Sequence, residues 1–193
     1  AEKEVKVDYI NKSDIHTLSD LRGNTSTYNY DAKHNLTSGT TPEGASYSFV
    51  PDVYGNTTES KATDKITNKG SIVAKAEYDP LYNGNYITKM TDSSGYSVNY
   101  SYNFKKGTLD TVTDPKGKVT SYSYDPYLNS LLNVSKSGIS NSYTYDKDRL
   151  KTISHNDFNY TFNYDDLGNN KEVFVGKQSQ RLLITNNFDT RSG

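Results

Sequence analysis

Residues 111–125 read TVTDPKGKVTSYSYD, and residues 135–145 repeat the pattern as SKSGISNSYTY. In both stretches an Asp or Ser opens the turn signal Asp/Ser-x-x-Gly, and the rings of a Tyr-x-Tyr follow it by eight and ten residues. The same spacing recurs from Asp20 and from Asp92. Because Gly and Asp favour turns while Tyr and Thr favour strands, this register predicts a tandem array of antiparallel β-hairpins.

The tyrosine pairs are predicted to build the interior of the array. Side chains alternate faces along a strand, so Tyr-x-Tyr places both rings on one face and the intervening Ser, Thr or Asn on the other. The predicted repeat core is Tyr28, Tyr30, Tyr47, Phe49, Tyr78, Tyr100, Tyr102, Tyr122, Tyr124, Tyr143, Tyr145, Tyr160, Phe162 and Tyr164. The predicted turn glycines are Gly23, Gly44, Gly95, Gly107, Gly117, Gly138 and Gly168.

The strand that returns from each tyrosine pair has a less regular pattern. Its apolar residues lie three apart, as in Leu131 and Val134 or Leu150 and Ile153. Strict alternation would put such residues on opposite faces. Either one of them sits at a turn, or each return strand carries a β-bulge, and the sequence leaves both options open.

Composition supports a tyrosine-based core and excludes several classes of protein. Hydrophobic residues make up only 32% of the 193 residues and the mean hydropathy is -0.86, but 18 Tyr supply large rings whose hydroxyls remain compatible with water. A net charge of -1 with interspersed signs argues against nucleic-acid binding, and no apolar run is long enough for membrane insertion. With no cysteine, neither a disulfide framework nor a thiolate metal site is expected.

The chain is predicted to contain a short extension and then the repeats. Residues 1–16 are assigned to an N-terminal strand or extension, and residues 17–193 to hairpin repeats that are degenerate over 50–77. In the early part, residues 47–49 are expected to replace Tyr-x-Tyr, and residues 68–70 are expected to form a turn. Residues 188–193 match the spacing of 102–107, so the array is expected to be truncated within a further unit.

The pattern Tyr-x-Tyr-Asp, Gly, Leu-x-x-Val, Asp-x-x-Gly resembles the YD repeats of the RHS and wall-associated proteins and of teneurins. Its clearest copies are residues 100–114, 122–135 and 143–153, and the resemblance covers roughly residues 17–193. It implies a long sheet that spirals into a hollow shell, which in the bacterial proteins encloses a C-terminal toxin. The longer Pro/Gly-rich core block of that family has no match in this sequence.

Function is expected to follow the resemblance. It implies a non-catalytic shell segment of a bacterial protein that is secreted or located at the cell surface, with flanking repeats and an enclosed toxin domain as partners. The alternative is a module that binds carbohydrate or cell-wall glycan through exposed tyrosines, since aromatic rings stack on sugars.

No catalytic, cofactor or metal site is predicted from the polar residues. His16, His34 and His155 lie in different units and are expected at the surface. The acidic pairs 146/148 and 165/166 lack the further oxygen ligands of a calcium loop and are interpreted as turn caps.

Overall fold

The computed structural model describes residues 4–63, 72–177 and 179–188, which form seventeen strands. The chain divides into two compact units, residues 1–99 and 100–193. In each unit, consecutive strands pair in an antiparallel fashion. The all-β class and the tandem antiparallel hairpins predicted from the tyrosine register are therefore confirmed.

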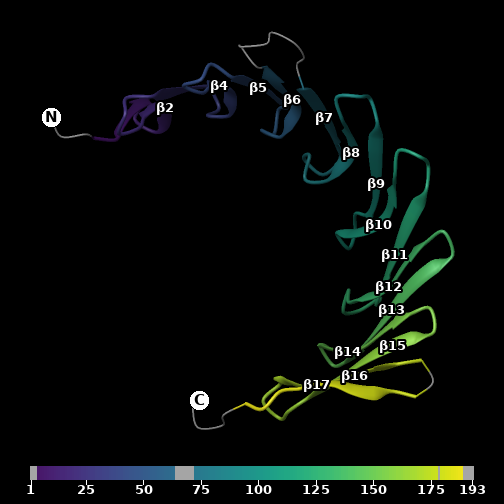
Figure 1. Ribbon diagram of the computed structural model, residues 1–193. Helices are drawn as coiled ribbons and strands as arrows, with labels where there is room; N and C mark the ends of the chain where they lie inside the picture. Colours follow the sequence, from purple (N-terminus) through teal and green to yellow (C-terminus); the bar gives the residue numbers. More distant parts are fainter. Residues whose placement is uncertain (1–3, 64–71, 178, 189–193) are drawn as a thin grey trace. The chain divides into compact units, whose positions relative to one another are not determined.

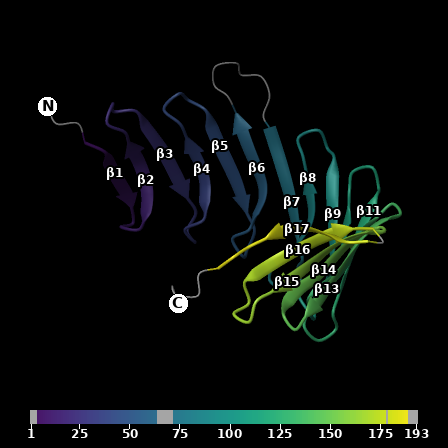
Figure 2. The same cartoon turned by 60° about the horizontal axis from the view of Figure 1, so that its bottom comes forward.

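Unit 1 is a single layer of strands, which lie side by side in chain order (Figure 2). Its strands are β1 (Lys6–Ile10), β2 (Asp14–Ser19), β3 (Thr25–Tyr30), β4 (Leu36–Thr40), β5 (Ser46–Pro51), β6 (Thr57–Thr63), β7 (Ile72–Tyr78), β8 (Ile87–Thr91) and the start of β9 (Ser97–Asn103). The turn predicted at 68–70 lies outside the described residues.

Unit 2 continues from the second part of β9 and repeats the same arrangement (Figure 1). Its further strands are β10 (Thr108–Thr113), β11 (Val119–Tyr124), β12 (Leu131–Lys136), β13 (Ile139–Asp146), β14 (Arg149–His155), β15 (Phe158–Tyr164), β16 (Asn170–Gly176) and β17 (Arg181–Thr185). Of the last segment, 188 is described outside any strand and 189–193 are not described.

Two kinds of strand pairing alternate along each unit. A hairpin joins a tyrosine strand to its return strand, as in β13–β14, where Asn141 to Asp146 are paired. A seam joins a return strand to the next tyrosine strand, as in β12–β13, where only Asn133 to Lys136 of β12 are paired. The turn that precedes a tyrosine strand is called a leading turn, and the turn that follows it a trailing turn.

A β-bulge in the return strand explains the three-residue apolar spacing. In β11–β12, Tyr124 pairs with Leu131 and Tyr122 with Val134, and Leu132 is the extra residue between them. The bulge therefore brings both apolar residues to the face of the two rings. The same shift occurs in β3–β4, β5–β6, β7–β8, β13–β14 and β15–β16.

The bulge also defines two ring positions on each tyrosine strand. The second position lies at the bulge next to the trailing turn, and the first lies two residues earlier. In β5 the second position is Pro51 and the first is Phe49, so Tyr47 stands two residues ahead of the pair. Residues 47–49 are expected from the sequence to take the place of Tyr-x-Tyr in this strand. The structure instead places Phe49 at the first position and Pro51 at the second, two residues later in the chain.

The two described hydrophobic side chains that are buried lie in β16, which is the return strand of β15 and carries no tyrosine. Val173 and Val175 of β16 are 8% and 5% exposed. Val173 pairs with Phe162 on one side and Ile184 on the other, and Val175 pairs with Tyr160. The short apolar run Val173-Phe174-Val175, which ends at Gly176, is the sequence signal that indicates this strand.

Candidate functional site

The ring face is the first candidate, because it gathers the predicted repeat core on one side of each sheet. Of the fourteen predicted residues, twelve are half-buried, whereas Tyr47 and Tyr160 are 42% and 37% exposed. Both exposed rings stand two residues ahead of a first-position phenylalanine, Phe49 or Phe162. Position relative to the bulge therefore decides which rings are covered by the neighbouring strands.

Second-position tyrosines reach across a seam to the preceding hairpin. The Tyr145 hydroxyl donates to the Leu131 carbonyl at 2.9 Å, and the Tyr164 hydroxyl donates to the Leu150 carbonyl at 2.7 Å. In unit 1 the Tyr78 hydroxyl donates to the Thr57 carbonyl at 3.1 Å. Each acceptor is the first residue of its return strand or lies directly beside the bulge. Sequence reasoning placed the rings but did not identify these bonds.

Threonines at the bulges of unit 1 form hydrogen bonds across the bulges. The hydroxyls of Thr37, Thr58 and Thr88 donate to the carbonyls of Asn29, Val50 and Glu77 at 3.1, 2.9 and 3.2 Å. Each of these carbonyls belongs to the residue just before the second position. A threonine hydroxyl therefore donates a hydrogen bond to a backbone carbonyl at the point where the bulge interrupts the regular ladder of backbone hydrogen bonds.

Many of the turns at both ends of the strands share one carboxylate-centred structure. In the leading turn at Asp20, Oδ1 accepts from the backbone N–H groups of Arg22 and Asn24, and Oδ2 accepts from the Asn24 amide. The trailing turn at Asp31 repeats this arrangement with Lys33 and Asn35. The two sequence signals, Asp-x-x-Gly before the rings and Asp after them, therefore describe one turn. All seven predicted turn glycines have positive φ: Gly23, Gly44, Gly95, Gly107, Gly117, Gly138 and Gly168.

These bonds lower the pKa of the turn carboxyls. The Asn24 side chain is the largest cause of the lowered pKa of Asp20, and the Asn169 side chain plays the same part for Asp165. The pKa values of Asp31, Asp114, Asp125 and Asp157 are lowered in the same way, each mainly by a donated hydrogen bond. Hydrogen bonds to the ionised carboxylate favour the charged form, so the turns are most stable when these groups are deprotonated.

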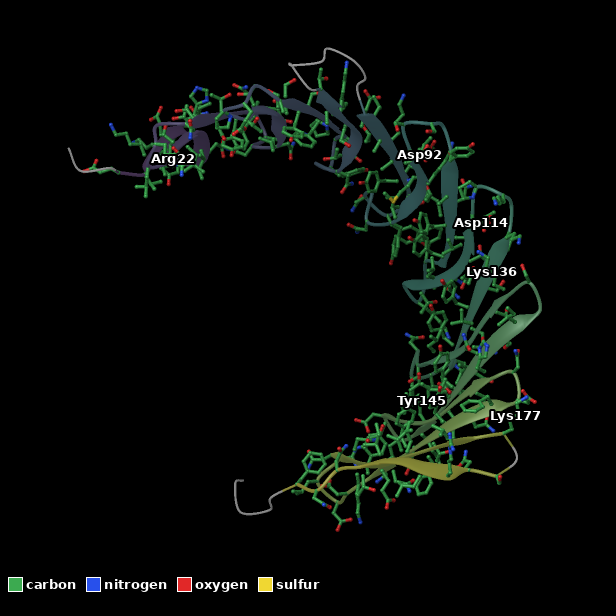
Figure 3. The ribbon with its side chains drawn as sticks, viewed as in Figure 1. Arg22, Asp92, Asp114, Lys136, Tyr145 and Lys177 are labelled. Atoms are coloured by element: carbon green, nitrogen blue, oxygen red, sulfur yellow. The ribbon has the colours of Figure 1, made fainter. Side chains whose placement is uncertain are left out.

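Ionic and polar contacts link successive turns. At the leading turns of unit 2, Lys136 lies 2.9 Å from the Asp114 carboxylate, and the two side chains are seen at the same end of the strands (Figure 3). Lys177 pairs with Asp157 in the same way at 3.0 Å. At the trailing turns, Lys106 Nζ donates to the Pro126 carbonyl at 2.8 Å. Each exposed pair of this kind contributes little to the free energy of unfolding, and each connects two neighbouring turns.

The trailing turns of β13–β14 and β15–β16 line a polar hollow of about 580 Å³ in unit 2. The predicted acidic pairs 146/148 and 165/166 meet here, together with Arg149, whose guanidinium lies 5.9 Å from the Tyr164 ring centroid. Basic side chains of the same turns offset the acids, and within the described residues no group of three or more His, Cys, Asp or Glu is placed to hold a metal ion.

The three histidines make separate structural contacts. His16 Nδ1 lies 3.0 Å from the Tyr28 carbonyl, His34 Nδ1 lies 2.6 Å from Asp14 Oδ2, and His155 Nδ1 lies 2.6 Å from Asn141 Oδ1. Each ring therefore links neighbouring strands or turns. The described part of the chain contains no helix long and apolar enough to cross a membrane.

Together these features define, in each unit, a sheet of antiparallel hairpins that carry the Tyr-x-Tyr register on one face. No protein-family model and no curated protein matches the sequence. Solved structures do share the fold. A chain of the Photorhabdus luminescens Tc holotoxin pore, in a structure that carries the mutation TccC3-D651A, matches with a TM-score of 0.67 at 17% identity over 82% of this chain. A chain of TcdB2-TccC3 matches with a TM-score of 0.67 at 18% identity over 88%.

These likenesses show that the fold is shared. A third structure, TcdB2-TccC3-TEV, matches at a TM-score of 0.54 and 11% identity. The chain spans about a tenth of the length of these solved chains, 9% and 10% for the first two.

Proposed function

We propose that this chain is a non-catalytic structural segment of an exported bacterial YD/RHS-repeat protein, and that its sheet forms part of a shell around a C-terminal toxin or effector. Its partners are flanking repeats of the same parent chain and the enclosed domain. The fold is shared with chains of a Tc holotoxin, which supports a role in carrying a toxin. No residue is assigned a catalytic or cofactor-binding role.

The recurrence of one building block carries this proposal. Six hairpins share the same bulge, and carboxylate-centred turns recur in both units, as at Asp20, Asp31, Asp114 and Asp165. A single layer built in this way covers area without a thick interior, because each strand buries its rings against the next strand. Such a repeat suits a wall better than a reaction centre, which needs convergent groups of different chemistry.

The test uses the full-length parent chain. Limited proteolysis should leave the segment C-terminal to the repeats intact while the repeats are folded, and should degrade that segment when it is expressed alone. Electron microscopy of the same sample should place residues 17–185 in a closed wall. Equal cleavage of the C-terminal segment in both samples would refute encapsulation.

Glycan binding through the tyrosines is the second candidate. It requires accessible rings, and among the predicted core residues only Tyr47 and Tyr160 are exposed, at 42% and 37%. Titration of the chain with millimolar cell-wall oligosaccharides, followed by NMR, distinguishes the two functions. Shifts confined to residues around these two rings would favour a binding module, and their absence would remove it.

A further inference from the structure

In unit 2, the seams β12–β13 and β14–β15 have shorter ladders than the hairpins that flank them. In unit 2, the seam β12–β13 pairs 133–136 with 139–142, whereas the hairpin β13–β14 pairs every residue from 141 to 146. The seam β14–β15 likewise pairs only 152–155 with 158–161. In both cases the ladder is continuous with the leading turn and stops before the trailing turn. The unpaired end of each seam therefore lies beside the second ring position.

At the unpaired end of the seam, a tyrosine hydroxyl, rather than a backbone N–H group, donates a hydrogen bond to the backbone carbonyl of the neighbouring strand. Beyond the last pair of β12–β13, Asn133 with Ser142, the Leu131 carbonyl accepts the Tyr145 hydroxyl. Beyond the last pair of β14–β15, Thr152 with Thr161, the Leu150 carbonyl accepts the Tyr164 hydroxyl. In unit 1 the Thr57 carbonyl accepts the Tyr78 hydroxyl beyond the end of the β6–β7 ladder.

The residue types at the two ring positions indicate that the second position requires a hydroxyl group and the first does not. The first position accepts a ring without one, as Phe49 and Phe162 show, and even Ala76 in β7. The second position is tyrosine in six of seven copies: Tyr30, Tyr78, Tyr102, Tyr124, Tyr145 and Tyr164, with Pro51 in the seventh. A purely apolar role would be served equally well by phenylalanine at both positions.

We propose that the second-position phenol is a latch that holds the open end of each seam, and that the array opens first at a seam whose latch is broken. This goes beyond the role of the rings in a common face, because it assigns the positioning function to a single hydroxyl group. Local opening at joints with few buried contacts is the ordinary low-energy fluctuation of a repeat protein.

The experiment compares two tyrosine-to-phenylalanine variants of the 193-residue chain by native-state amide hydrogen exchange, resolved residue by residue with NMR. Tyr145→Phe keeps the ring and removes the bond to Leu131. Amides that bond across the β12–β13 seam should exchange about fivefold faster, the change expected from one net hydrogen bond. Amides that bond across the β13–β14 hairpin should keep their wild-type rates.

The matched control is Tyr143→Phe, because Tyr143 occupies the first position of the same strand and the structure gives its hydroxyl no partner among the described residues. It should leave both sets of rates unchanged. Tyr164→Phe should accelerate exchange at the β14–β15 seam alone. Unchanged seam rates in Tyr145→Phe, or one uniform acceleration of all amides, would overturn the latch.

Discussion

At the scale of single residues, Gly168 shows how a turn can require the absence of a side chain. It has φ +90°, and a Cβ placed on it would collide with the Arg149 guanidinium. Gly117, with φ +78°, has open space around it. Gly117→Ala should cost about 1 kcal/mol of backbone strain. Gly168→Ala should cost about 0.5–1 kcal/mol more, because Arg149 must leave the Tyr164 ring.

Urea unfolding followed by circular dichroism measures both glycine variants against the parent chain. Equal losses in the two variants would mean that the Arg149 contact contributes nothing to stability.

The register relative to the bulge predicts which rings matter most. Tyr145 is half-buried, pairs with Leu150 and bonds to Leu131, whereas Tyr47 is 42% exposed. Tyr145→Ala should lower the free energy of unfolding by about 2–3 kcal/mol, less than the value for a fully enclosed ring because one layer buries it incompletely. Tyr47→Ala should cost less than about 1 kcal/mol. Thermal melts that rank these variants in the opposite order would contradict this assignment.

At the residue scale, the sequence predicts the turns better than the bonds between hairpins. An Asp-x-x-Gly turn is built from neighbours in the chain, so its residues can be recognised in order. The bonds from Tyr145 to Leu131 and from Tyr164 to Leu150 depend on how two hairpins align. The sequence alone cannot distinguish a hydroxyl that donates from one that points into water.

At the scale of the element, the bulge residue Leu132 should be more dispensable than Ser135 of the same strand. Removing Leu132 leaves Leu131 and Val134 two residues apart, so both still face Tyr124 and Tyr122. Removing Ser135, which lies outside the bulge, shifts β12 by one residue against β13, so that Val134 can keep its face toward Tyr122 only by losing its pairing with Asn141. The second deletion should therefore cost about 1.5–3 kcal/mol more than the first.

Chemical denaturation of the two deletion variants measures this difference. If the Leu132 deletion is as damaging as the Ser135 deletion, the bulge itself, rather than the facing of the apolar residues, supports the strand.

At the element scale, the sequence pattern does not determine every strand. A bulge and a turn both explain why the two apolar residues of a return strand lie three apart, so the spacing alone cannot distinguish them. The shifted assignment at 47–49 has a related cause: Tyr47 and Phe49 imitate the tyrosine pair, while Pro51, which occupies the second position, has no ring. The tyrosine register marks β15 but no residue of β16, because the buried residues of β16 are valines.

At the scale of the whole molecule, stability is distributed over many equivalent small contributions rather than held in one core. Only Val173 and Val175 among the described hydrophobic side chains are less than a tenth exposed. The turns therefore contribute a larger share of the specificity than they would in a two-layer protein. Because the same carboxylate-centred turn recurs in both units, a condition that weakens one turn weakens all of them together.

Acid is such a condition, and it should destabilise the protein cooperatively. The pKa values of Asp20, Asp31, Asp52, Asp114, Asp125, Asp157 and Asp165 lie below the ordinary value of 3.8. A carboxyl whose folded pKa is lowered contributes stability above its unfolded pKa, and this contribution disappears as the pH falls through the folded pKa. The melting temperature should therefore change little between pH 7 and 5 and fall steeply below about pH 4.

The matched control for the acid transition is a chain with Asp20→Asn, Asp114→Asn and Asp165→Asn. An asparagine oxygen still accepts the turn N–H groups but carries no charge, so this variant should start from a lower melting temperature at pH 7. It should also lose less stability than the parent chain between pH 5 and 2.5, because fewer carboxylates remain to be protonated. Parallel melting curves for the two chains across this range would assign the acid transition to groups outside the turns.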